Sequence, residues 1–353
     1  MKRWISRLTV SFFALVLAVG IACAGDSVTV SGLLAEDVMV PLTLIKELPQ
    51  ITEEVVPVTS AGVETQYAAT GAMFSDVLAH YGKRQEDILG IRLVASDGYS
   101  IDVPREILME RQIILAYVVD GIPLEQSGES LRVVIPGERA MYWVRNLSRI
   151  EVIDQIQRAE VRTIRFLESL AQMGPLEDYP YFGHVDQALK IQEILEYLEI
   201  VEQPERVFFK ASDGFEKNEA YDEFVSGYIK VTGRSAPLFL SPELPEGMHV
   251  RDIVFFLLGD NAFASLAQAF NYYEPKMVDD VVGISFLELM TDLEIAQGDM
   301  YRLTALDGYQ IEVTDEDMAQ GYVSFYEGQV CSYFPGLPPN TSVRSLYTVE
   351  VLQ

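Results

Sequence analysis

Few of the side chains that most often perform chemistry occur in this chain. Among 353 residues there are 2 Cys and 3 His. The histidines are scattered and form no H-x-x-x-H or H-E-x-x-H pattern, which zinc hydrolases need. Glycine motifs that bind phosphates and the G-x-S-x-G nucleophile motif are also absent from the sequence. The sequence therefore offers no metal site or catalytic triad based on histidine or cysteine.

Carboxylates, in contrast, are abundant. There are 53 Asp and Glu residues against 26 Lys and Arg, which gives a formal net charge of −27. This balance disfavours nucleic-acid binding and docking on an anionic membrane, because both need clustered basic residues. Asp279-Asp280 and Asp315-Glu316-Asp317 could bind Ca²⁺, but they lack the spacing of an EF-hand loop. We interpret them as a solvated acidic face, with a calcium-dependent surface module as an alternative.

One Asp-Gly pair recurs three times, and each copy follows an apolar run. The pairs are Asp97-Gly98, Asp213-Gly214 and Asp307-Gly308. In the first and third copies, a stretch of alternating apolar and polar residues follows the turn. This pattern predicts a tight β-hairpin, because glycine tolerates a positive φ and the Asp side chain can close the turn. We therefore assign these residues to turn formation rather than to catalysis.

Further landmarks accompany each Asp-Gly pair in the same order. A short amphipathic helix is predicted before each turn, at residues 71–78, 188–195 and 283–290. A strand follows each turn, and each copy closes on a Val-Arg pair that contains Arg145, Arg251 or Arg344. Their recurrence predicts a structural role for these arginines, such as a buried ion pair or a contact with a strand-end carbonyl. Three tandem copies of one pattern are thus predicted.

The landmarks divide the chain into four segments. Residues 1–24 form a leader, and three units follow at residues 25–155 (unit 1), 156–262 (unit 2) and 263–353 (unit 3). Residues 154–173 predict a helix that leads into unit 2. No low-complexity linker separates the units, so we expect them to pack together, and units 2 and 3 could also be halves of one domain.

The leader has the composition of a secretory signal. Three basic residues precede an apolar run, and Ala22-Cys23-Ala24 matches a small-x-small cleavage site. The run is shorter than the roughly 20 residues that a transmembrane helix needs. We expect an exported protein, periplasmic or extracellular, that is not integral to a membrane after cleavage and has a formal charge of −30. Lipid attachment at Cys23 is an alternative that the preceding residues fit less well.

Unit 1 carries five informative stretches in this order: Gly71 to Leu78, Ala95 to Tyr99, Ile114 to Leu124, Leu131 to Gly137 and Trp143 to Val152. With them, unit 1 resembles the molybdopterin-binding domain of the sulfite-oxidase type over residues 27 to 153. The resemblance implies a mixed α+β fold of short strands and helices, which units 2 and 3 would repeat in degenerate form. Enzymes of this family hold molybdenum on a pterin dithiolene, and a protein cysteine completes the ligation.

The resemblance places the family's cysteine at Ser60. A serine hydroxyl has a much higher pKa than a thiol and is a harder, poorer ligand for a redox-active molybdenum ion. The basic residues expected just after it, which help to hold the anionic cofactor, are replaced by Glu64 and Thr65. Cys331 lies elsewhere in the pattern, so we interpret it as a buried, inert thiol.

These departures lead to three hypotheses. The first is an exported, non-catalytic binding or scaffold protein whose partner is a protein or a small molecule, with no metal and no cofactor. The second is a molybdenum-cofactor-dependent oxidoreductase with unit 1 as the catalytic domain and Ser60 as an unusual ligand. The third is the calcium-dependent surface module, which rests only on the acidic charge.

Overall fold

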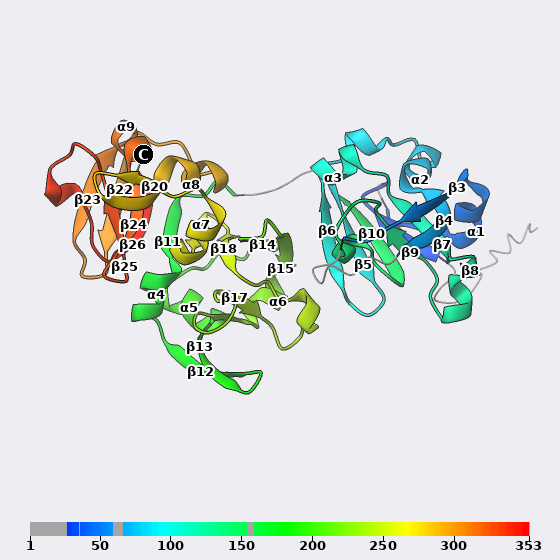
Figure 1. The fold of residues 1–353 in the computed structure, drawn as a ribbon, viewed down its shortest axis with the longest axis horizontal. Coiled ribbons are helices and arrows are strands. Elements are labelled where there is room, and N and C mark those ends of the chain that lie inside the picture. Colours follow the sequence, from blue (N-terminus) through cyan, green and yellow to red (C-terminus); the bar gives the residue numbers. More distant parts are fainter. Residues whose placement is uncertain (1–26, 35, 59–65, 154–158, 353) are drawn as a thin grey trace, which may run out of the picture.

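The computed structural model describes residues 27–34, 36–58, 66–153 and 159–352. Short strands and short helices alternate along the chain, so the predicted α+β fold class is confirmed. Figure 1 shows two bodies, one formed by unit 1 and the other by units 2 and 3. Within the described ranges, no helix has the length and apolar character needed to cross a membrane.

Unit 1 begins with a strand at Ser27, and its first helix begins at Leu42. Its strands are β1 (Ser27–Ser31), β2 (Val38–Pro41), β3 (Gln50–Val55), β4 (Tyr67–Met73), β5 (Gly90–Ala95), β6 (Ser100–Pro104), β7 (Ile114–Val119), β8 (Ile122–Pro123), β9 (Arg132–Val134) and β10 (Leu147–Ile153). Its helices are α1 (Leu42–Glu47), α2 (Phe74–His80), α3 (Arg105–Glu110) and the 3-10 helices η1 (Gln85–Asp87), η2 (Leu124–Ser127) and η3 (Ala140–Tyr142).

Units 2 and 3 contain shorter versions of the same series. The elements of unit 2 are β11 (Thr163–Phe166), α4 (Leu167–Met173), β12 (Leu176–Tyr181), β13 (His184–Lys190), α5 (Ile191–Tyr197), β14 (Arg206–Ala211), β15 (Glu216–Ala220), α6 (Tyr221–Val225), β16 (Tyr228–Lys230), β17 (Leu238–Leu240), η4 (Glu246–Met248) and β18 (Ile253–Leu258). Those of unit 3 are β19 (Asn261–Ala264), α7 (Leu266–Tyr272), β20 (Lys276–Val278), β21 (Val281–Ser285), α8 (Phe286–Asp292), β22 (Met300–Ala305), β23 (Gln310–Thr314), α9 (Asp315–Gln320), β24 (Tyr322–Tyr326), β25 (Gln329–Tyr333), η5 (Pro339–Thr341) and β26 (Leu346–Leu352).

The element order is the same in the three units, apart from the additional strands β1 and β8 and the additional 3-10 helices η1 and η2 of unit 1. Each series starts with a strand and a helix, and a hairpin that runs into a second helix follows. The Asp-Gly hairpin and a third helix come next, and two strands, a 3-10 turn and a long final strand close the series. The order of landmarks seen in the sequence is therefore also an order of secondary structure.

The sheets join these elements differently in the two bodies. Unit 1 has one sheet ordered β2-β1-β10-β5-β6 and another ordered β3-β4-β7-β8, with β9 also on β7. Its main core lies among buried residues such as Phe74, Leu93 and Ile150. Units 2 and 3 share one eight-stranded sheet, ordered β15-β14-β18-β19-β11-β26-β22-β23, and each keeps a separate four-stranded sheet.

The shared sheet is built by exchange of the first strands of units 2 and 3. Strand β11 of unit 2 pairs with the last strand of unit 3, β26, and β19 of unit 3 pairs with β18 of unit 2. The two first strands lie parallel at the centre of the sheet. The predicted boundary between residues 262 and 263 falls inside β19, and the chain turns just before it, at Gly259 and Asp260.

The helices predicted before the Asp-Gly turns begin later than expected. Strands β4, β13 and β21 occupy the first part of each predicted segment, and α2, α5 and α8 follow them. A short apolar run buried on both sides does not distinguish a strand from a helix. At Gly71 a Cβ would lie 2.1 Å from the carbonyl oxygen of Leu115, so the neighbouring strand requires glycine there. The helix predicted over 154–173 is likewise helical only from Leu167 to Met173 among its described residues.

Candidate functional site

The place of interest in unit 1 is the connection between β3 and β4, at residues 56–66. Ser60, Glu64 and Thr65 lie outside the described residues. The chain that leads into them is fixed at Val58, whose N–H donates to the carbonyl of Glu138 at 3.3 Å and whose carbonyl accepts from Ala140 at 2.9 Å. The segment around Arg139 therefore borders the stretch where the resemblance puts the metal ligand.

Arg139 lies at this border, and acidic side chains of the same chain bind it and three further arginines of unit 1. Arg139 Nη1 lies 3.2 Å from Asp213 Oδ2, and its Nη2 donates to the Asp213 carbonyl at 2.9 Å. Arg111 Nε donates to Glu138 at 2.8 Å. The remaining two, Arg132 and Arg145, share Glu129.

Glu129 is the least exposed carboxylate of this group, at 5%. Burial by itself would raise its pKa, but hydrogen bonds from Arg145 and Arg132 hold the pKa of Glu129 below its usual value. Arg132 is mostly buried, whereas the Arg145 side chain is 67% exposed. Carboxylates of the same chain thus already pair with these four guanidinium groups, and an anionic cofactor would have to compete with them for the same donors.

Units 2 and 3 replace the β3–β4 connection with tight turns. Phe182-Gly183 joins β12 to β13, with φ values of 43° and 83°. Asp279-Asp280 joins β20 to β21, with φ values of 48° and 68°. A two-residue turn has no room for a loop that carries a metal ligand, so these units offer no counterpart of the Ser60 stretch.

Metal and thiol chemistry find little support elsewhere in the described ranges. No group of three or more His, Cys, Asp or Glu residues is placed to hold a metal ion there. The acidic run from Asp315 to Asp317 forms the first turn of α9, where the Thr314 hydroxyl accepts from the Asp317 N–H at 3.2 Å. Cys331 is 6% exposed, and burial raises the pKa of its thiol, as expected for an inert cysteine.

The three Asp-Gly pairs have the same local geometry. Their glycines have φ values of 89°, 81° and 86° at Gly98, Gly214 and Gly308. Their carboxylates accept backbone N–H bonds at 3.0, 2.9 and 2.9 Å: Asp97 from Tyr99, Asp213 from Phe215, and Asp307 from Tyr309. These contacts close turns and leave the carboxylates at the surface.

The arginines of the Val-Arg pairs are not buried, contrary to the expected buried ion pair. Arg145, Arg251 and Arg344 are all exposed. Arg145 reaches the buried Glu129, whereas the Arg344 guanidinium lies 4.8 Å from the centre of the Tyr326 ring. The buried member of each pair is the preceding valine, whose carbonyl accepts from a neighbouring strand at 2.8 to 2.9 Å: Val144, Val250 and Val343.

Sequence reasoning missed a buried ion pair on β15. Lys217 and Glu219 are 3% and 5% exposed, and they pair with each other while Lys217 donates to the Met248 carbonyl at 2.7 Å. The matching hairpin positions hold Ile and Val in unit 1, at Ile101 and Val103, and in unit 3, at Ile311 and Val313. The sequence carried this signal, because the second copy alone lacks the apolar alternation after its turn.

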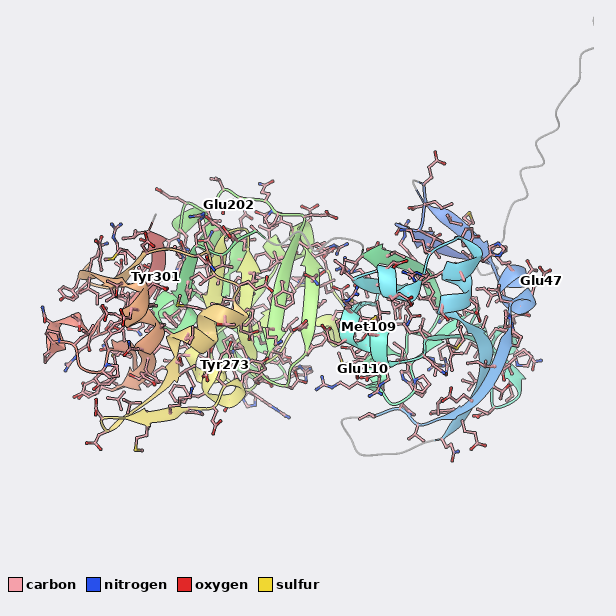
Figure 2. The ribbon with its side chains drawn as sticks, turned by 90° about the horizontal axis from the view of Figure 1, so that it is seen from above. Glu47, Met109, Glu110, Glu202, Tyr273 and Tyr301 are labelled. Atoms are coloured by element: carbon pink, nitrogen blue, oxygen red, sulfur yellow. The ribbon has the colours of Figure 1, made fainter. Side chains whose placement is uncertain are left out.

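The open groove on unit 1 is the feature best suited to a small ligand. It has a volume of about 520 Å³, within the usual range of ligand sites, and it is lined by Ser27, Met39, Pro41, Leu42, Thr43, Lys46 and Glu125. Lys46 pairs with Glu125 at 2.7 Å, and its ammonium lies 5.3 Å from the centre of the Tyr117 ring. Figure 2 places neighbouring Glu47 at the end of unit 1 that faces away from units 2 and 3.

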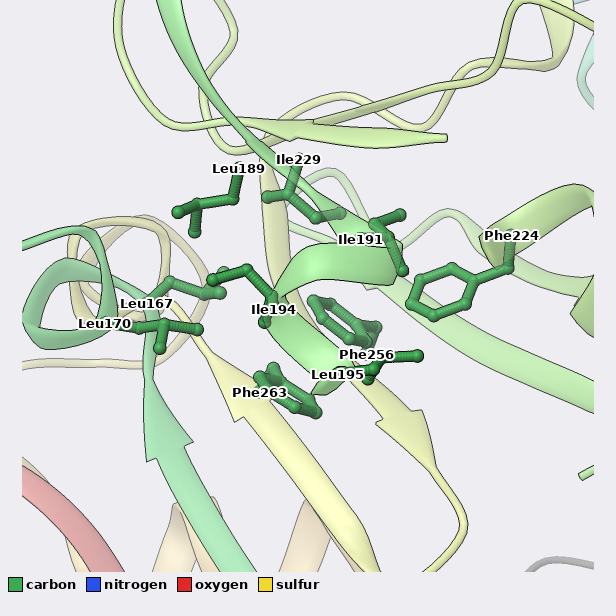
Figure 3. A pocket seen from close by; sticks show the side chains of 10 residues that line it. All are labelled: Leu167, Leu170, Leu189, Ile191, Ile194, Leu195, Phe224, Ile229, Phe256 and Phe263. Atoms are coloured by element: carbon green, nitrogen blue, oxygen red, sulfur yellow. The ribbon is translucent and has the colours of Figure 1, made fainter. Parts of the chain in front are cut away.

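An enclosed cavity in unit 2 is a packing defect rather than a site. Figure 3 shows its wall of ten apolar side chains, which α4, α5 and the shared sheet contribute among other elements. Its volume of about 10 Å³ is close to the minimum for one water molecule, and no polar atom lines it. It is far too small for a pterin or any other organic ligand.

A family model agrees with the resemblance of unit 1. Residues 27–161, less than half of the chain, match the family model of the oxidoreductase molybdopterin binding domain. No curated protein matches the chain. Among solved structures, the sulfane dehydrogenase SoxCD from Paracoccus pantotrophus matches with 14% identity and a TM-score of 0.33. That match covers 60% of this chain and 61% of the other, so it spans about three fifths of SoxCD. Residues 27–161 thus correspond to a molybdopterin-binding domain model.

Proposed function

We propose that this protein is an exported binding or scaffold protein, built from three molybdopterin-binding-like units that have lost molybdenum chemistry. The observation that carries the proposal is the residue at the ligand position, Ser60, where the resemblance expects a cysteine. A soft thiolate stabilises a redox-active molybdenum centre, and a neutral hydroxyl does not replace it. The pairing of Arg139 with Asp213 and of Arg111 with Glu138 supports the same conclusion, because these two guanidinium groups already bind carboxylates of the same chain.

The groove on unit 1 is the part of the protein that we expect to bind a small ligand. Its walls combine the exposed Met39 with the apolar Leu42, and the Lys46–Glu125 pair supplies one charge of each sign. Such a lining suits a small molecule with an apolar part and a polar end. A thermal-shift screen with small molecules of this kind, repeated on a Met39→Asp variant at the exposed side of the groove, measures whether the groove binds them.

Metal and pterin analysis tests the loss of molybdenum chemistry directly. The full chain, with its leader, is produced in a host that makes the molybdenum cofactor, and a sulfite-oxidase-type enzyme from the same host is the positive control. We expect neither molybdenum nor releasable pterin in the purified protein. Stoichiometric molybdenum with pterin would overturn the proposal.

A molybdenum-dependent oxidoreductase is the second candidate, and the match of residues 27–161 to the family model favours it. Molybdenum in the wild type would support this candidate; if the wild type holds none, the Ser60→Cys variant tests whether the missing thiolate alone prevents cofactor binding. If the ancestral site is intact except for its ligand, this variant gains molybdenum that the wild type lacks. If the arginines are also unavailable, neither protein loads the cofactor.

A further inference from the structure

The two bodies meet at the edges of their large sheets. Strand β6 ends the sheet of unit 1, and β15 ends the eight-stranded sheet on the side of unit 2. These two edge strands lie against each other. Phe215, which precedes β15, packs against the main core of unit 1 as well as the core of unit 2.

A network of polar contacts crosses this junction. Arg92, which is 4% exposed, holds Asp102 through two hydrogen bonds of 2.7 and 3.0 Å and donates to the Asn218 carbonyl at 3.1 Å. The Asn218 amide donates to Asp102 Oδ2 at 2.6 Å. Beside it, Arg206 of unit 2 lies 3.4 Å from Glu151 of unit 1. Unit 2 thus supplies a donor to each of two carboxylates of unit 1.

The opposite end of the eight-stranded sheet offers a second, equivalent edge. The strand order is symmetrical about the β19–β11 pair, so β23 of unit 3 corresponds to β15 of unit 2. The hairpin registers show which residues correspond. Asn218 faces Phe208 across its hairpin, and Glu312 faces Arg302 at the same position in unit 3. At the base of the two hairpins, Arg206 corresponds to Met300.

This second edge lacks the amide and guanidinium donors that Asn218 and Arg206 supply on unit 2, and its Arg302 is already paired with Glu312 at 2.9 Å. A carboxylate at the Glu312 position would face Asp102 where the Asn218 amide now donates, and like charges at a desolvated contact are strongly unfavourable. Met300 has no donor for Glu151. The corresponding turn residues, Asp213 and Asp307, are both aspartates. The contact that Asp213 makes with Arg139 therefore does not distinguish the two edges.

We propose that Asn218 and Arg206 direct unit 1 to the edge of unit 2, and that Glu312 and Met300 exclude it from the equivalent edge of unit 3. The β15 edge of unit 2 thus recognises the β6 edge of unit 1 by its two carboxylates, Asp102 and Glu151. This selection goes beyond the proposed function, because it fixes which surfaces of unit 1 are covered. The side near α3 faces the other body, whereas the end with Glu47 stays open (Figure 2).

The isosteric change Asn218→Asp tests the proposal in the protein without its leader, residues 25–353. It replaces the amide donor with a carboxylate next to Asp102. We expect the radius of gyration from small-angle X-ray scattering to increase, and hydrogen exchange in β6 and β15 to become about tenfold faster or more. Exchange in β5 and β14, which lie inside their sheets, reports whether both bodies remain folded.

Two further variants complete the test. Arg206→Met removes the donor to Glu151 at a half-exposed position, so it keeps the test decisive if Asn218→Asp does not fold. Glu312→Gln is the matched control on the free edge, and we expect it to change neither scattering nor exchange. Unchanged scattering and exchange in the folded Asn218→Asp or Arg206→Met variant would overturn the proposal, and so would an equal effect of Glu312→Gln.

Discussion

The buried pair Lys217–Glu219 gives the most informative stability prediction. The two residues occupy positions where units 1 and 3 have apolar side chains, at Ile101 and Val103 in unit 1. Replacing both, as Lys217→Ile with Glu219→Val, restores that apolar pattern. Replacing Glu219 alone leaves an ammonium group buried without its counterion.

The structure sets the expected magnitudes. At 3% and 5% exposure, both charges are desolvated, so loss of one partner should lower the free energy of unfolding by about 3 to 5 kcal/mol. The double variant removes both desolvation penalties, which is often neutral or stabilising by about 1 to 4 kcal/mol. Loss of the Lys217 hydrogen bond to the Met248 carbonyl offsets about 1 kcal/mol of that gain. We expect a net change between zero and about 3 kcal/mol in favour of the double variant.

Guanidinium unfolding, followed by two signals, measures this prediction. Far-UV circular dichroism reports all three units, whereas Trp143, the single tryptophan after residue 24, reports unit 1. The substitutions should shift the dichroism transition and leave the fluorescence transition in place. The exposed pair Arg302–Glu312 is the control, and its removal should change stability by less than about 1 kcal/mol.

Two results would refute this reasoning. Glu219→Val could prove as stable as the wild type, or the double variant could prove as unstable as Glu219→Val. A pH series adds a second check. Burial lowers the pKa of Lys217, so the folded protein releases this proton before the unfolded chain does. In Glu219→Val, the free energy of unfolding should therefore rise with pH, up to the usual lysine pKa of about 10.4.

Three further predictions concern single side chains. Burial raises the pKa of Tyr99 and Tyr142 to about 12. The free energy of unfolding of unit 1 should therefore fall by about 2 to 3 kcal/mol per tyrosine as the pH rises from 10 to 12. An unfolding transition, followed by Trp143 fluorescence, that stays constant over this range would contradict this. Gly308→Ala adds a Cβ in open space at a φ of 86°, so backbone strain alone should lower stability by about 1 to 2 kcal/mol in thermal unfolding, and no change would contradict the turn assignment. The Cys331 thiol should react with iodoacetamide only after unfolding, and rapid labelling of the native protein would contradict its burial.

Much of the local structure could be predicted because it depends on neighbouring residues. The Asp-Gly hairpins are an example, since the glycine conformation and the hydrogen bond that the Tyr99 N–H donates to Asp97 both lie within one turn. The boundaries of the helices before these turns were less predictable. The same apolar residues satisfy a strand or a helix, and pairing with a distant strand decides between them.

The candidate site divides in the same way. The serine at position 60 and the acidic residue at position 64 are matters of sequence alone, and they already weaken the enzymatic hypothesis. The pairing of Arg139 with Asp213, residues separated by 74 positions, depends on how unit 1 docks on unit 2. No local pattern encodes that contact.

The sequence by itself determined the turns, the order of elements and the residue at the ligand position, because these depend on residue type and short-range geometry. Only the tertiary structure decided that units 2 and 3 exchange their first strands in one sheet, and that unit 1 meets the β15 edge. It also decided that Lys217 and Glu219 are buried together. Strand pairing and burial depend on residues far apart in the chain, and their energies come from desolvation and complementary charges that exist only after packing.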